Sequence, residues 1–408
     1  MQYSIIFSKT KNSSMKLSFS LFFYAYFDAF PLKYKDLLNA QEKKRRDRHI
    51  PRAAIKPYKY SSFCHLFLSG NDQALLTATG HDHHSFNQLL QMFRPYYDRY
   101  TWDTKLKRIR KKVLDKYGNP KGRQRDMTAC GCLGLVLMWY RTRGSCARGL
   151  AMLFGQTSSP LYLWLKFGRK VLLHVLSRET RALVRLPNEE EVRFFCHVIA
   201  NKYPVLQDVW GAADGLKLTI QSPTDHTKQN KFYNGWHHSN NINSVFVFSP
   251  DGKIRLCLIN APGTFHDSTM ADYGIYEGME HVYDEYGAKV VVDSAFKIGV
   301  KDFVIKSSQE DPLDPDQLVT NRAATSVRLL SEWGMRQLGG AFPRMKDPVL
   351  YEEQNERKVI LRLMVHLHNF QTSVIGINQI MNLFCDKISY YQHLGGIADN
   401  ANFMLPSY

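Results

Sequence analysis

The spacing of hydrophobic residues changes near Pro204, and the change predicts two kinds of structure along the chain. An apolar stripe at helical spacing runs through Phe86, Leu89, Leu90 and Phe93. This is the periodicity of one buried face of an α-helix. After Pro204 short apolar runs alternate with turn residues, which is typical of strands. We therefore expect a helical N-terminal part and an α/β C-terminal part.

The apolar runs of the C-terminal part predict strands over 216–220, 244–248, 254–258 and 289–292. Ser249-Pro-Asp-Gly252 separates the second run from the third and has the composition of a hairpin turn. Helices are expected around 268–278, after residue 325 and over 359–370. A hairpin, a further strand and intervening helices together predict a mixed α/β sheet.

The stretch 127–176 has the layout of a helix-turn-helix, with a short helix over 147–154 and a turn over 155–158. Ser159 fits the N-cap of the second helix, and Pro160 fits its first position, where a missing N–H costs nothing. In such a motif the second helix enters the DNA major groove, while Lys and Arg hold phosphates. The candidate DNA contacts are Arg148, Ser158, Ser159, Tyr162, Lys166, Arg169 and Lys170. A small helical bundle without a DNA role fits the same pattern. A connecting helix is expected over 183–203.

Charge is distributed unevenly over the 408 residues, whose formal net charge is +17. Residues 1–200 contain 35 Lys and Arg against 14 Asp and Glu, a balance of +21 (35 − 14). The remainder contains 19 and 23, a balance of −4 (19 − 23). The run 105–125 is expected to be an exposed basic linker, whose phosphate contacts would make affinity salt-dependent. The basic half favours nucleic acid as a partner, although solubility or an anionic membrane surface would give the same composition.

The N-terminal residues and the cysteines bear on cellular location. The apolar run 17–27 follows three lysines but is too short to span a bilayer, and the basic cluster 43–48 is of the nuclear type. The seven cysteines do not form a disulfide framework and indicate a reducing compartment. Cys130-Gly-Cys132 lacks the spacing of a zinc knuckle. Residues 1–35 are expected to be an extraneous extension.

Three acidic residues are the candidates for chemistry. Asp214 and Asp293 each stand where a strand-like apolar run meets small residues, so that they can meet at neighbouring strand ends. Glu332 would add a third carboxylate from a helix, and three such oxygens suit Mg²⁺. Taken singly, the two aspartates also fit ordinary turns, and Arg328, Glu332 and Arg336 fit an exposed ion-pair ladder. We expect Asp225, Asp251, Asp272 and Asp302 to be turn or surface residues. His366 and His368 are expected to pack or cap.

Six short strings carry a resemblance to a known family. They are Gly211-Ala-Ala-Asp-Gly215, Phe232-Tyr-Asn-Gly-Trp236, Pro250-Asp-Gly252, Pro262-Gly-Thr-Phe-His-Asp-Ser268, Val292-Asp-Ser-Ala-Phe296 and Arg328-Leu-Leu-Ser-Glu-Trp-Gly334. With gaps of 79 (293 − 214) and 39 (332 − 293) between the three acids, the chain resembles the DDE transposases of the Harbinger/PIF type over roughly residues 205–370.

The resemblance implies an RNase H-like mixed-sheet catalytic domain preceded by an all-α helix-turn-helix region. Asp214 would lie on the central strand, Asp293 at the end of the fourth strand and Glu332 on a later helix. The three would hold two Mg²⁺ or Mn²⁺ ions about 4 Å apart, with Asp214 bridging them. His266, Asp267 and Arg328 would position the substrate or a water beside these ligands, although Asp267 could equally stabilise its loop.

The expected organisation has five parts, and the implied function is that of a nuclear transposase. The parts are a basic, disordered extension over 1–60, a helical region with a basic linker over 61–126, the helix-turn-helix region over 127–204, the DDE nuclease domain over 205–375 and a tail over 376–408. The protein would cut double-stranded DNA at transposon ends and transfer the freed 3′-hydroxyl strand, as a homodimer and with a Myb-like DNA-binding partner. The alternatives are a domesticated nuclear DNA-binding protein and a nuclease acting on other DNA.

Overall fold

The computed structural model describes residues 50–118, 121, 125–144, 147–223, 225–235, 238–296, 301–308, 314–349, 354–376 and 379–384. The chain divides into two compact units, Met1–Ile55 and Lys56–Tyr408. The first unit contributes the short 3₁₀ helix η1 (Arg52–Ala54). The basic cluster 43–48, almost all of the expected extension 1–60 and most of the expected tail 376–408 lie outside the described residues. All that follows concerns the second unit.

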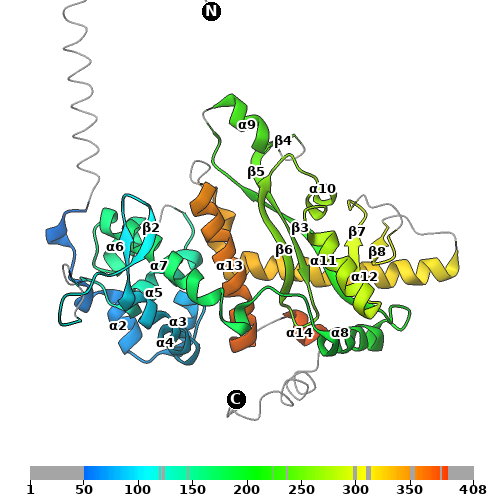
Figure 1. Cartoon of the computed structure of the whole chain (residues 1–408), viewed down its shortest axis with the longest axis horizontal. Coiled ribbons are helices and arrows are strands. Elements are labelled where there is room, and N and C mark those ends of the chain that lie inside the picture. The colour runs from blue at the N-terminus through cyan, green and yellow to red at the C-terminus, as the bar shows by residue number, and fades with distance from the viewer. Residues whose placement is uncertain are drawn as a thin grey trace, which may run out of the picture. The chain divides into compact units, whose positions relative to one another are not determined.

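The first half of the second unit is built mainly from helices, as the apolar spacing predicts (Figure 1). They are η2 (Tyr58–Tyr60), α2 (Ser62–Leu68), α3 (Asp72–Thr79), α4 (His83–Arg99), α5 (Ala129–Arg141), α6 (Ala147–Leu153), α7 (Ser158–Leu176), η3 (Thr180–Ala182) and α8 (Glu189–Lys202). The stripe on α4 is buried as expected, since Phe86, Leu89 and Phe93 are 0% exposed. Buried helix α5 lies at the centre of this part, where it packs against α3, α4 and α7.

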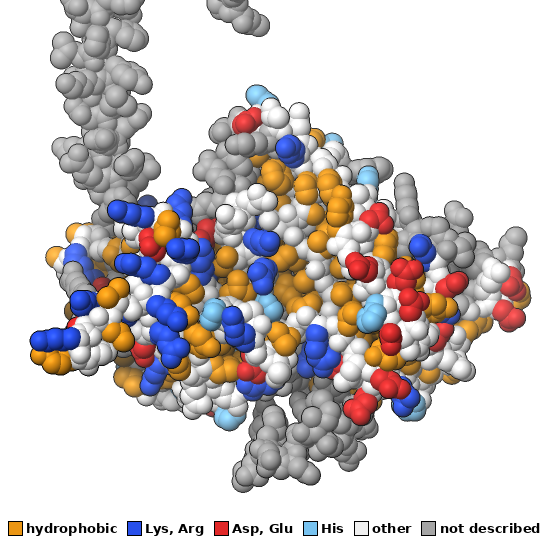
Figure 2. Space-filling model, in the orientation of Figure 1, with side chains coloured by type: hydrophobic (Ala, Val, Ile, Leu, Met, Phe, Trp, Pro, Cys, Tyr) orange, Lys and Arg blue, Asp and Glu red, His pale blue; other side chains and the backbone are white. Residues whose placement is uncertain are grey.

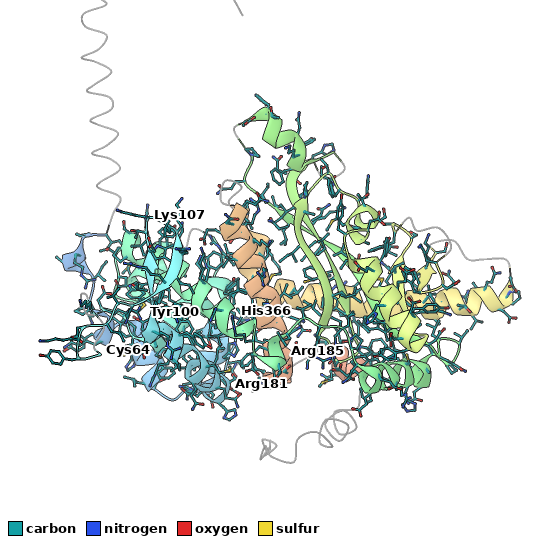
Figure 3. The ribbon with its side chains drawn as sticks, in the orientation of Figure 1. Cys64, Tyr100, Lys107, Arg181, Arg185 and His366 are labelled. Atoms are coloured by element: carbon teal, nitrogen blue, oxygen red, sulfur yellow. The ribbon has the colours of Figure 1, made fainter. Side chains whose placement is uncertain are left out.

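The expected basic linker over 105–125 is instead partly a β-hairpin. Strand β1 (Tyr100–Asp103) pairs antiparallel with β2 (Arg108–Lys111), and Lys107 adopts a positive φ of 48° in the turn between them (Figure 3). The sequence does not predict β2, because Ile109 is the single apolar residue in this strand and a longer run is needed to show the alternation of polar and apolar residues. The basic side chains therefore project from a fixed ribbon.

Two helix boundaries in this part differ from expectation. Helix α7 begins at Ser158 with Thr157 as the N-cap, two residues before the expected cap at Ser159, and the Thr157 side chain makes no capping hydrogen bond. The connecting helix expected over 183–203 begins only at Glu189. Asn188 and Glu191 form a capping box there, and the residues before it are not helical. The capping box provides hydrogen-bond acceptors for backbone N–H groups that have no partner within the helix, and it therefore fixes the start of α8 at Glu189.

A mixed sheet forms the second half, with strand β3 (Val209–Thr219) at its centre. The other strands are β4 (Tyr233–Asn234), β5 (Ser239–Phe248), β6 (Ile254–Pro262), β7 (Lys289–Asp293) and β8 (Val304–Ser307). Their order is β4-β5-β3-β7-β8, with β6 also paired to β5. β3 pairs antiparallel with β5 and parallel with β7, so the expected mixed sheet is confirmed.

Helices cover both faces of the sheet. On one face Ala213, Val245, Val247 and Val292 pack with Met270 and Met279 of α10 (Asp267–Ala271) and α11 (Ile275–Tyr286). On the other face Ala212, Phe246, Phe248 and Val291 pack with Val327 and Leu330 of α12 (Pro315–Ala341), and α13 (Gln354–Ile375) covers β6. The alternation of side chains along each strand produces these two cores.

The helices of this half also depart from their expected limits. The helix expected over 268–278 is two helices, α10 and α11, because Gly274 takes a φ of 101° between them. Helix α12 begins at Pro315, ten residues before its expected start, after the N-cap Asp314. The remaining elements are α9 (His226–Phe232), η4 (Pro343–Lys346) and α14 (Gln379–Phe384). None of the described helices is long and apolar enough to cross a membrane.

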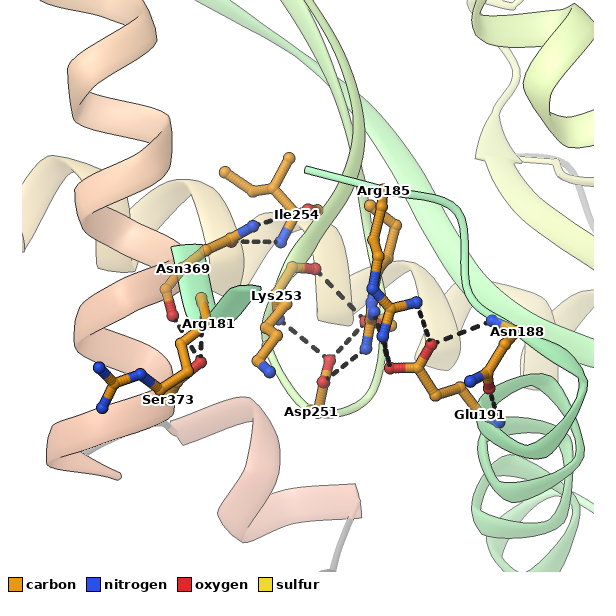
Figure 4. A network of polar contacts seen from close by, with 12 residues as sticks. Arg181, Arg185, Asn188, Glu191, Asp251, Lys253, Ile254, Asn369 and Ser373 are labelled. Atoms are coloured by element: carbon orange, nitrogen blue, oxygen red, sulfur yellow. Dashed lines mark hydrogen bonds and ion pairs between the residues drawn. The ribbon is translucent and has the colours of Figure 1, made fainter. Parts of the chain in front are cut away.

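The hairpin turn between β5 and β6 anchors a buried ionic network (Figure 4). Asp251, expected to be a turn or surface residue, lies in this turn but is only 1% exposed, and its Oδ2 lies 2.8 Å from Nη2 of Arg255. Nη1 of Arg255 lies 3.0 Å from Oε1 of Glu191 on α8. The side chain of Asn369 on α13 bonds the backbone N and O of Ile254, at 2.9 and 3.0 Å. The network thus ties α8 and α13 to the hairpin.

Helix α13 also joins the two halves of this unit. Tyr140 on α5 donates from its hydroxyl to the Ile360 carbonyl at 2.8 Å, and Nδ1 of His366 donates to the Ala182 carbonyl at 2.9 Å (Figure 3). His368 donates from Nε2 to the Gly252 carbonyl at 2.9 Å. Both histidines therefore pack and bond as expected.

Candidate active site

Asp214 and Asp293 occupy adjacent positions on two neighbouring parallel strands. The register between β3 and β7 pairs Ala213 with Val292, so the next residue on each strand is one of the two aspartates. Neighbouring strands lie about 4.8 Å apart, and residues side by side in register face the same side of the sheet. The sequence prediction that these two acids meet is therefore supported by the topology.

The surroundings of Asp214 differ from the expected strand end. Asp214 lies in the middle of β3, where it is paired with Phe246 of β5, whereas Asp293 is the last residue of β7. Within the described part of the chain, no strand continues the pairing with β3 on the β7 side beyond Ala213. The ladder between β3 and β7 therefore ends next to both carboxylates.

Burial and neighbouring charges alter the acidity of Asp214. Burial raises the pKa of Asp214 from its usual 3.8 to about 6, and the charge of Asp293 adds to the rise. The Gly215 N–H donates to Asp214 Oδ1 at 2.7 Å and opposes the rise, as does Arg328. Asp293 Oδ1 accepts a hydrogen bond of 2.7 Å from the Ser294 N–H. The site therefore holds two close carboxylates, whose repulsion the charge of Arg328 offsets only in part.

Glu332 lies on α12 but is engaged by its neighbour on the same helix. Its Oε1 is 2.9 Å from Nη2 of Arg328, one turn away, and the two side chains are 29% and 25% exposed. Among the residues that the structure describes, no three Asp, Glu, His or Cys side chains lie close enough together to hold one metal ion. The structure thus brings the two aspartates together without Glu332.

Asp267 approaches the same strand from α10. A Cβ added to Gly215 would come within 2.5 Å of both Cγ and Oδ1 of Asp267, so the carboxylate lies directly against the Gly215 backbone. Burial raises the pKa of Asp267, Lys217 and His266 lower it, and Asp293 raises it further. His266 is exposed at the N-cap of α10, and its side chain caps nothing. Of the predicted positioning residues, Asp267 and Arg328 therefore adjoin the aspartate pair.

A polar cavity of about 450 Å³ opens beside Asp293. It is lined by Asp293, Ser307, Ser308, Asn321, Arg322, Thr325, Ser326 and Arg328. This lining suits a phosphate group. Each Arg guanidinium can donate two parallel hydrogen bonds to phosphate oxygens, and the hydroxyls and the amide can donate further ones. Asn321 and Arg322 were not predicted as site residues, because the helix that carries them was expected to start after residue 325. A larger cavity, of about 1460 Å³, is lined only by residues of the helical part.

The predicted DNA contacts fall into two groups. Arg148 and Ser159 are exposed, Tyr162 is 52% exposed, and Ser158 and Lys166 are half-buried. Arg169, in contrast, is 6% exposed, and its guanidinium lies 3.7 Å from the centre of the Trp139 ring. Lys170 donates to the Lys107 carbonyl at 2.6 Å and lies 3.7 Å from Glu356. The fold therefore engages Arg169 and Lys170, whereas Arg148, Ser159 and Tyr162 are exposed.

The fold of the sheet and the position of the acid pair indicate the same class of protein. A curled mixed sheet between helices, with carboxylates on adjacent parallel strands, is consistent with an RNase H-like DDE domain. Residues 213–369 match the family model described as DDE superfamily endonuclease. The match includes Asp214, Asp293 and Glu332, and it supports the superfamily without distinguishing its subdivisions. No curated protein and no solved structure matches the chain.

The donor atoms present fit a divalent cation in part. DDE superfamily endonucleases generally use divalent metal ions, and carboxylate oxygens are the ligands that Mg²⁺ and Mn²⁺ prefer. Asp214 and Asp293 offer such oxygens side by side, at the end of the β3–β7 ladder. Oδ1 of Asp267 is buried, and none of the described residues donates a hydrogen bond to it. Glu332 would have to leave Arg328 to join them.

Proposed function

We propose that this protein is a metal-dependent DNA endonuclease of the transposase type. The observation that carries the proposal is the Asp214 and Asp293 pair, placed beside a cavity that Arg322 and Arg328 line. Carboxylates for a metal and guanidiniums for a phosphate are what the hydrolysis of a phosphodiester requires. The family match over 213–369 supports the same reaction class.

Each residue has a role that follows from its position. Asp214 and Asp293 would hold the cation, with Glu332 as the third ligand once it is released by Arg328. Bound Mg²⁺ or Mn²⁺, two ions per site, would activate the attacking oxygen and stabilise the leaving oxygen. Arg322 and Arg328 would orient the phosphate in the cavity, and the hydroxyls of Ser307 and Thr325 would fix its position. Because the pKa of Asp214 is raised to about 6, cation binding would release a proton from it only in weakly acidic solution.

The basic helical part would bind the DNA. On the face drawn in Figure 2, Lys and Arg gather over this part, and Asp and Glu gather around α11 and α12. Arg148, Ser158, Ser159, Tyr162 and Lys166 remain accessible for contact. A helix-turn-helix formed by α6 and α7 would place these residues in or beside the major groove.

The finer assignment rests on the sequence strings. We propose a nuclear transposase of the Harbinger/PIF type that transfers the 3′-hydroxyl strand to target DNA as a homodimer. Two DNA ends require two active sites, which favours the dimer. A Myb-like DNA-binding partner follows from the same resemblance. The Arg328–Glu332 ion pair supports one rival, a domesticated nuclear protein that binds DNA without cutting it, because it withholds the third carboxylate.

Cleavage of a supercoiled plasmid tests the proposal. The full chain with Mn²⁺ should nick the plasmid and leave 3′-hydroxyl ends, and Asp293→Ala should lower the rate at least a hundredfold. Asp284→Ala, which changes an exposed acid of α11, is the matched control and should cut normally. Salt-sensitive binding without cleavage by the wild-type chain would overturn the nuclease in favour of the domesticated DNA-binding protein.

A further inference from the structure

The larger cavity is lined by residues of the β1–β2 hairpin and of helices α2, α4, α5 and α7. Its volume, about 1460 Å³, exceeds the roughly 300–1,000 Å³ of most pockets for small ligands, so it suits a stretch of polymer better than one small molecule. Helix α7 contributes Pro160, Leu163, Trp164 and Phe167, whose spacing places them on one face of that helix. The cavity therefore adjoins the exposed residues of α7 that are proposed to contact DNA.

Positive charge outweighs negative charge in the lining of this cavity. Among the described residues that line it, five are Lys or Arg and two are Asp. Arg94 and Arg110 are exposed, and half-buried Arg125 donates to backbone carbonyls of α4 and β1, which carry no net charge. Burial and the charge of Arg125 lower the pKa of Lys112, while Asp98 opposes them. A polyanion in the cavity would relieve this crowding of cations.

Two tryptophans border the cavity beside these cations. Trp102, on the hairpin, and Trp164, on α7, are both half-buried, so part of each ring is accessible from the cavity. Lys170 lies over the Trp102 ring, 5.0 Å from its centre, and Tyr97 stacks on Trp164 with ring centroids 6.1 Å apart. These contacts hold the two rings in place. Aromatic rings fixed beside a basic groove are the combination that binds single-stranded nucleic acid, because every base has a face that can stack.

We propose that this cavity binds unpaired nucleotides of a DNA strand. The bases stack on Trp102 and Trp164. The phosphates lie against Arg94, Arg110 and Lys112. A duplex cannot use the two rings in this way, because its bases are stacked inside the helix. The inference rests on the DNA-binding role proposed for the helical part and extends it: a duplex lies on the exposed face of α7, and an opened or overhanging strand enters the cavity.

Fluorescence anisotropy of a labelled oligothymidylate strand, with the full chain in EDTA, tests the proposal without any metal ion. Wild type should bind the strand, and Trp102→Ala should weaken binding about tenfold or more at every salt concentration. Trp102→Phe should retain most of the affinity, because a Phe ring also stacks on a base. Tyr286→Ala removes a ring that is 39% exposed at the end of α11, in the other half of the unit. This matched control should bind like wild type.

A second variant tests the phosphate contact and serves if Trp102→Ala does not fold. Arg110→Ala changes an exposed side chain of β2, and it should reduce the salt slope of oligothymidylate binding by about 1. A residue that only supports the fold would leave this slope unchanged. Binding by both variants that equals wild type in affinity and in slope would overturn the proposal.

Blunt duplex DNA, as a second probe, separates this inference from the DNA-binding role itself. Wild type that binds the duplex but not oligothymidylate would overturn the inference alone, and wild type that binds neither would overturn the DNA-binding role. A synthetic amphipathic peptide of Leu and Glu serves as a third probe. If the peptide binds wild type but not Trp102→Ala, and oligothymidylate binds neither, the cavity belongs to a protein partner and the proposal is wrong.

Discussion

Two clusters of buried acids in the same sheet are arranged in opposite ways. At the β5–β6 turn Asp251 lies against Arg255, which also reaches Glu191. At the end of β7 Asp214 faces another carboxylate, Asp293, and burial raises its pKa to about 6. Burial would also raise the pKa of Asp251, but Arg255 and Lys253 hold it below its usual value. Paired acids hold the fold together, and acids left facing one another are the signature of a functional site.

Removing the cation from the paired cluster should have the largest effect. Arg255→Ala leaves Asp251 buried without its cation, while Glu191 keeps Arg185, and should lower the free energy of unfolding by about 3–5 kcal/mol. Asp293→Asn removes a repulsive charge and should not destabilise the metal-free protein. Urea unfolding of both variants checks this contrast. Equal losses in the two would show that the clusters do not differ.

The pH dependence of stability should have opposite sign at the two clusters. The pKa of folded Asp214 lies above its usual 3.8, so its stabilising contribution is complete below pH 3.8 and is lost as the pH rises through 6. A shift of this size corresponds to about 3 kcal/mol. The lowered pKa of Asp251 gives the reverse, a contribution present above 3.8 and lost in acid.

Unfolding of the metal-free protein between pH 4 and 7 measures the first contribution. Wild type should lose stability relative to Asp214→Asn as the pH rises over this range. Parallel curves for the two proteins would contradict the raised pKa.

Two cations of α7 should separate stability from DNA binding. Arg169→Ala removes the stacking of a buried guanidinium on Trp139 and should cost about 1–2 kcal/mol of stability. Lys166→Ala should cost less stability than Arg169→Ala, because Lys166 is only half-buried. It should weaken DNA binding at low salt and reduce the salt slope by about 1. Fluorescence anisotropy at several salt concentrations checks this, and an unchanged slope would exclude Lys166 from the interface.

The ion pair on α12 should contribute least to stability. Arg328 and Glu332 are each at least a quarter exposed, so Arg328→Ala should change the free energy of unfolding by less than about 1 kcal/mol. Glu332 becomes free to bind a cation, so Mn²⁺ should bind more tightly while cleavage slows for lack of the phosphate contact. Weaker Mn²⁺ binding in Arg328→Ala would show that the pair does not withhold Glu332.

The sequence predicts those parts of this structure that depend on local pattern. The apolar runs around Val245 and Val290 predicted strands β5 and β7. The position of Asp214 and Asp293 beside such runs predicted that the two acids meet. Asp214 was expected at a strand end because Gly215 breaks the apolar run, yet pairing with β5 carries the strand further. Tertiary pairing overrode the local signal there.

Contacts between distant segments could not be predicted in this way. Asp251 does lie in the expected turn, but its burial was not predicted, because Arg255, which pairs with it, also contacts Glu191, 60 positions before Asp251 in the chain (251 − 191). The contact of Asp267 with Gly215 depends on how α10 packs on the sheet, which no spacing reveals. The early start of α12 was missed because residues 315–325 are mostly polar, and Asn321 and Arg322 were missed with it.

The account stands on the claim that Asp214 and Asp293 bind a divalent cation between them. Thermal unfolding of the full chain at pH 7.5, with and without Mn²⁺, tests this most directly. Wild type should unfold at a higher temperature with Mn²⁺, and the double variant Asp214→Asn/Asp293→Asn should not respond. An unfolding temperature of the wild-type protein that Mn²⁺ leaves unchanged, or an equal rise in the double variant, would contradict the claim.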